Sequence, residues 1–245
     1  MATGILAPQT LRNTLARLDH YDVALPAAVL DALAELERVE GLRPPATEEH
    51  DLVDAYRDPA LKPAQVAAVA ARILADALMR RAWDQARNGA AQAGVRCLAE
   101  HAADILEALR PTAERHIDTL VWYAEHDAPD VATLVNAGKM DDATKAAAVP
   151  SAHAEWGSLT ALRAAITKPL SFEGWGRGGT WAHPERIRAA TVGRSLSGLD
   201  LIVTGVKAGG VMYWPTMAEA ANVAERDNDA EQAAFRSDKA LSTFA

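Results

Sequence analysis

The strongest constraint on the fold lies between residues 63 and 80, where apolar side chains recur at three- and four-residue intervals. Val66, Ala70, Ile73 and Ala77 fall on one face of a helix that begins at Pro63. A second helical stripe follows between residues 95 and 109. The two stripes predict core contacts for Val66, Ile73, Leu74, Leu78, Leu98, Ile105 and Leu109.

Helical spacing extends over most of the first 167 residues. Alanine is abundant, whereas the chain has only three Phe, four Tyr and six Trp, so close contacts between helices should dominate the core. We expect a break or kink at Asn88-Gly89, and another kink or a new start at Pro111. The sequence therefore predicts a mainly α protein, with a helical bundle domain over residues 1–167.

The pattern changes at residue 168. Four glycines between residues 174 and 179 oppose regular structure and predict an extended arm. The β-branched run at 199–206, the turn KAGG and the run at 211–214 predict a β-hairpin. We therefore expect an arm and hairpin over 168–214, followed by a C-terminal helix that opens at Pro215 and a tail over 215–245.

Charge excludes some classes of function. The net charge is −8, and residues 168–210 form the only basic segment, with six Lys and Arg against three Asp and Glu, or +3. An acidic chain repels nucleic acid, so nucleic-acid binding is disfavoured. The N-terminal sequence lacks the features of a signal peptide, no apolar run is long enough to span a bilayer, and the single cysteine, Cys97, fits a reducing compartment. These features predict a soluble, cytoplasmic protein without a membrane partner.

The residues that could support catalysis, metal binding or phosphate binding are better explained by structural roles. The glycine cluster continues as Thr180-Trp181, without the Lys-Ser or Lys-Thr of a phosphate-binding loop and without a βαβ context. The histidines lack the helical spacing of zinc or di-iron ligands. Cys97 and His101 lie one helical turn apart, but a buried structural thiol is the favoured interpretation. We therefore predict no catalytic residue, no metal and no cofactor.

Two hypotheses remain. The favoured one is a non-enzymatic structural or assembly protein that binds other copies of itself or another protein, as in a cytoplasmic assembly or a virion-type particle. Tryptophan and arginine are the usual anchors of protein interfaces. The alternative is an enzyme or ligand-binding protein whose pocket holds a small acidic molecule through arginines of 177–194. The predicted interface residues are Trp175, Arg177, Trp181, Arg186, Arg188, Tyr213 and Trp214.

Overall fold

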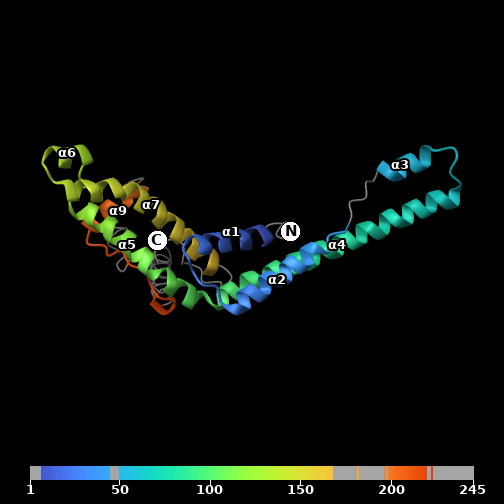
Figure 1. The fold of residues 1–245 in the computed structure, drawn as a ribbon, viewed down its shortest axis with the longest axis horizontal. Coiled ribbons are helices and arrows are strands. Elements are labelled where there is room, and N and C mark those ends of the chain that lie inside the picture. Colours follow the sequence, from blue (N-terminus) through green and yellow to red (C-terminus); the bar gives the residue numbers. More distant parts are fainter. Residues whose placement is uncertain are drawn as a thin grey trace, which may run out of the picture. The chain divides into compact units, whose positions relative to one another are not determined.

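The computed structural model describes residues 7–44, 50–167, 181, 196, 198–219 and 222. These residues are mainly helical, which confirms the predicted class, and they contain no strand beyond one isolated antiparallel bridge between Trp181 and Met212. The helices shown in Figure 1 are α1 (Ala7–His20), α2 (Ala27–Gly41), α3 (His50–Arg57), α4 (Pro63–Glu100), α5 (Ala102–Glu125), α6 (Val131–Asn136), α7 (Met140–Thr167) and α9 (Gly198–Lys207).

The chain divides into two compact units. Unit 1 comprises residues 1–16 and 25–98, and unit 2 comprises residues 17–24 and 99–245. The division falls within α4. Residues 168–180 lie outside the described part of the chain, so a domain limit at 167 stays a prediction.

In unit 1, polar contacts join the end of α2 to the middle of α4. The Trp83 indole N–H donates to the carbonyl oxygen of Val39 over 2.7 Å, and Arg87 pairs with Glu40 over 3.0 Å. The Arg87 guanidinium also lies over the Trp83 ring, 5.4 Å from its centroid, where a cation–π interaction is favourable. Helix α2 ends level with Trp83, so the N-terminal half of α4 extends beyond the end of α2 (Figure 1).

Helix α1 packs against α4 at Gly94. A Cβ atom at Gly94 would lie 2.6 Å from Cδ2 of the buried Leu11 side chain. A Cβ atom at Gly89, five residues earlier, would meet nothing within 4 Å. The glycine at position 94 therefore permits a close approach that position 89 does not require.

The Gly94→Leu variant is expected to lower the free energy of unfolding by about 1 to 3 kcal/mol, because the added carbons overfill the α1–α4 contact. The matched Gly89→Leu variant should be stabilised by up to about 1 kcal/mol through helix propensity alone. Denaturant unfolding of both variants gives the measurement. Equal shifts in both would contradict the packing of α1 on Gly94.

Helix α4 is continuous, so the break expected at Asn88-Gly89 is wrong. The backbone N–H of Lys62 donates to the Gln65 side chain over 2.8 Å and closes the N-terminal turn. The interruption comes instead at His101, between α4 and α5. Contacts with Val39 and Leu11 on both sides of the Asn-Gly pair offset its low helix propensity.

The predicted core is confirmed in one half and wrong in the other. Leu98, Ile105 and Leu109 are buried, whereas Val66 and Ile73 are only half-buried. Leu74 and Leu78 are 63% and 59% exposed, so they are not core residues of the single chain. Periodicity identifies the apolar stripes of a helix, but it does not show whether another element covers each stripe.

Unit 2 is built on α5 and α7, which pack together, with α9 against α5 and α6 against α7. Pro111 lies inside α5 and starts no new helix. Its cyclic nitrogen has no hydrogen to donate, but packing on α7 holds the helix on both sides of it. Helix α6 begins where the Asp130 carboxylate accepts a hydrogen bond from the Thr133 N–H over 3.0 Å.

The predicted β-hairpin is wrong, because residues 198–207 form helix α9. Ile202 is buried in this helix, and the helix packs on α5. The packing between α9 and α5 outweighs the β-propensity of the run. Gly209 ends the helix with a φ of 79°, and Gly210 N–H donates to the Gly205 carbonyl over 2.9 Å. The KAGG sequence is therefore a helix C-cap and not a hairpin turn.

Candidate functional site

The first candidate is an exposed apolar face on the N-terminal half of α4. At 100° per residue, six exposed apolar residues fall within an arc of about 100°. We call this surface the 67–82 face, and it consists of Ala67, Ala71, Leu74, Ala75, Leu78 and Ala82. The half-buried residues of the same segment, such as Val69 and Ile73, lie on the other side of the helix. The 67–82 face therefore adds nothing to the core formed by the described residues.

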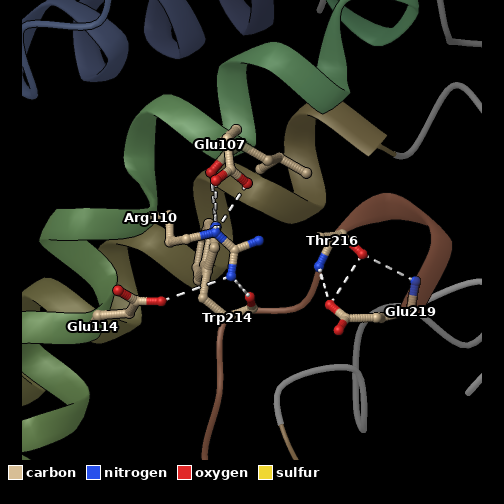
Figure 2. A network of polar contacts seen from close by, with 7 residues as sticks. Glu107, Arg110, Glu114, Trp214, Thr216 and Glu219 are labelled. Atoms are coloured by element: carbon tan, nitrogen blue, oxygen red, sulfur yellow. Dashed lines mark hydrogen bonds and ion pairs between the residues drawn. The ribbon is translucent and has the colours of Figure 1, made fainter.

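The second candidate is the buried indole of Trp214, which fastens the segment after α9 to α5 and α7. Trp214 is 1% exposed, and its indole N–H donates to the carbonyl oxygen of Leu106 over 2.9 Å. The Arg110 guanidinium donates in turn to the carbonyl oxygen of Trp214 over 2.8 Å (Figure 2). The Trp156 ring meets the indole edge-on at a centroid distance of 5.9 Å. We call this arrangement the Trp214 anchor.

Two arginines place positive charge around the Trp214 anchor. The Arg163 guanidinium is 4% exposed and lies 5.0 Å from the centroid of the Trp214 ring. Burial lowers the pKa of Arg163 to about 10, so the side chain remains charged at neutral pH. A hydrogen bond to Glu107 raises the pKa of Arg110. The indole ring thus faces a buried cation, while a paired cation binds the backbone carbonyl of the same residue.

A capping box follows the Trp214 anchor. The Thr216 N–H donates to the Glu219 carboxylate over 2.7 Å, and the Glu219 N–H donates back to the Thr216 hydroxyl over 3.2 Å (Figure 2). The Thr216 hydroxyl also donates to the Glu219 carboxylate, over 3.0 Å, and the two hydrogen bonds that the carboxylate accepts from Thr216 lower the pKa of Glu219. Residues 217–219 and 222 are helical, in agreement with a helix opening at Pro215, and the rest of the predicted C-terminal helix lies outside the described residues.

A third cluster joins the end of α1 to α7 within unit 2. The Tyr21 hydroxyl donates to a carboxylate oxygen of Glu155 over 2.8 Å, and His20 Nε2 lies 4.0 Å from the same oxygen. Burial raises the pKa of Tyr21. His116 is half-buried, and burial lowers its pKa, although the charge of Glu155 opposes the shift. The cluster ties residues 17–24 to α7.

Acidification is expected to destabilise the protein through His116. Its pKa is lower in the folded state, so the unfolded chain binds more protons between the folded pKa and about 6.5. The free energy of unfolding should therefore fall as pH decreases below about 6.5. Urea titrations of the wild type and His116→Gln at several pH values measure the difference. Identical pH dependence in both proteins would show that His116 contributes nothing.

The predicted interface residues separate into three groups. Trp181 is 9% exposed and bridges to Met212, and Trp214 belongs to the Trp214 anchor, so both are buried within the chain. Tyr213 is half-buried beside Trp214. Trp175, Arg177, Arg186 and Arg188 lie outside the described residues, as does Arg194 of the alternative pocket. Contacts of these residues with a partner remain predictions.

Two structural searches cover only the described part of the chain. No helix there is long and apolar enough to cross a membrane. Within the same residues, no three His, Cys, Asp or Glu side chains are grouped as metal ligands would be.

Sequence reasoning missed both the Trp214 anchor and the 67–82 face. The contact of Trp214 with Leu106 joins residues 108 positions apart, and no local pattern encodes it. The 67–82 face was visible as a second apolar stripe beside the first, since Leu74 and Leu78 are four residues apart. A helix that is apolar on two sides needs a packing partner on each side. The second apolar stripe in the sequence could therefore have indicated the 67–82 face.

Comparison with protein-family models, with curated proteins and with solved structures gave no match to this chain.

Proposed function

We propose that this chain is a non-enzymatic assembly protein, a subunit that binds another copy of itself or another protein. The observation that carries the proposal is the exposure of Leu74 and Leu78 in the middle of a long helix. A contiguous exposed apolar patch is typical of a protein interaction site. Exposure of the apolar 67–82 face to water is unfavourable, and a partner bound to the face would remove that exposure.

The position of the 67–82 face supports an interaction and not a catalytic role. The face lies on a helix surface beyond the end of α2, and it contains no titratable or nucleophilic side chain. Catalysis requires groups that bind or move protons or electrons at the substrate. A charge-free helix face can supply only apolar contact area.

The proposal extends to the arm that includes residues 172–188. Trp175, Arg177, Arg186 and Arg188 provide aromatic and cationic side chains suited to an acidic partner surface. Burial of Trp181 at the Met212 bridge would tether that arm to unit 2. The arm and the 67–82 face would then offer two separate contact surfaces.

Light scattering of the purified full-length chain tests the proposal. We expect a defined mass greater than that of the monomer, increasing with protein concentration. A thermal-shift screen with phosphates and dicarboxylates serves as the companion measurement. A strict monomer that is stabilised by one of these anions would overturn the proposal and favour an arginine-lined ligand site.

A further inference from the structure

We draw no further inference here: the strongest candidate, the exposed apolar 67–82 face on α4, carries nothing beyond the proposed function, because nothing in the described part of the chain shows what covers the face.

Discussion

Replacing Trp214 with alanine is expected to lower the free energy of unfolding of unit 2 by about 3 to 5 kcal/mol. The indole is 1% exposed, contacts Trp156 and Arg163, and donates a hydrogen bond to Leu106. Its removal opens a cavity beside a buried guanidinium, so relaxation of the surrounding side chains can recover little of the loss. Chemical denaturation followed by circular dichroism measures the change.

Two variants separate the contributions within the Trp214 anchor. Trp214→Phe retains an aromatic ring but loses the N–H donor, and should cost about 1 to 3 kcal/mol. Tyr213→Ala, at the half-buried neighbouring position, should cost less than Trp214→Ala. If Trp214→Ala left the denaturation midpoint unchanged but abolished oligomers, Trp214 would be an interface residue as the sequence predicted, and the Trp214 anchor would be wrong.

The second large effect is expected at Leu106. Leu106→Ala should destabilise the protein by about 2 to 5 kcal/mol, because the side chain is 2% exposed on α5 and its loss leaves a cavity. Leu74→Ala makes the same chemical change at a position that is 63% exposed. In dilute protein it should change the free energy of unfolding by no more than about 0.5 kcal/mol.

The two leucine variants also distinguish core packing from assembly. At higher protein concentration the stability of the wild type should increase with dimer formation, and Leu74→Ala should reduce that increase. Leu106→Ala should lose the same stability at every concentration. Equal losses for both variants in dilute protein would place Leu74 in a core that the structure does not show.

Helical periodicity predicted most of the fold because it is a local property. Leu98, Ile105 and Leu109, which lie on the predicted stripes, are buried as expected. These outcomes depend on residues within one or two turns of each other. Spacing along the chain is therefore sufficient to predict them.

The errors arose where distant contacts decide the outcome. The run at 199–206 has the composition of a strand, yet packing on α5 makes it helix α9. Asn88-Gly89 has low helix propensity, yet contacts on both sides keep α4 continuous. The Trp214 anchor depends on an oxygen of α5 that precedes it by 108 residues. None of these contacts has a signature in the local sequence.

Sedimentation equilibrium of the full-length chain and its Leu78→Lys and Met79→Lys variants tests the assembly role of the 67–82 face most directly. Lysine suits a helix, and Met79 is half exposed like Leu78 but points about 100° away. Between roughly 1 and 500 µM, the wild type and Met79→Lys should approach or exceed the mass of a dimer. The association constant of Leu78→Lys should be about tenfold lower than that of the wild type. A monomeric wild type throughout this range, or equal association of Leu78→Lys and the wild type, would contradict the account.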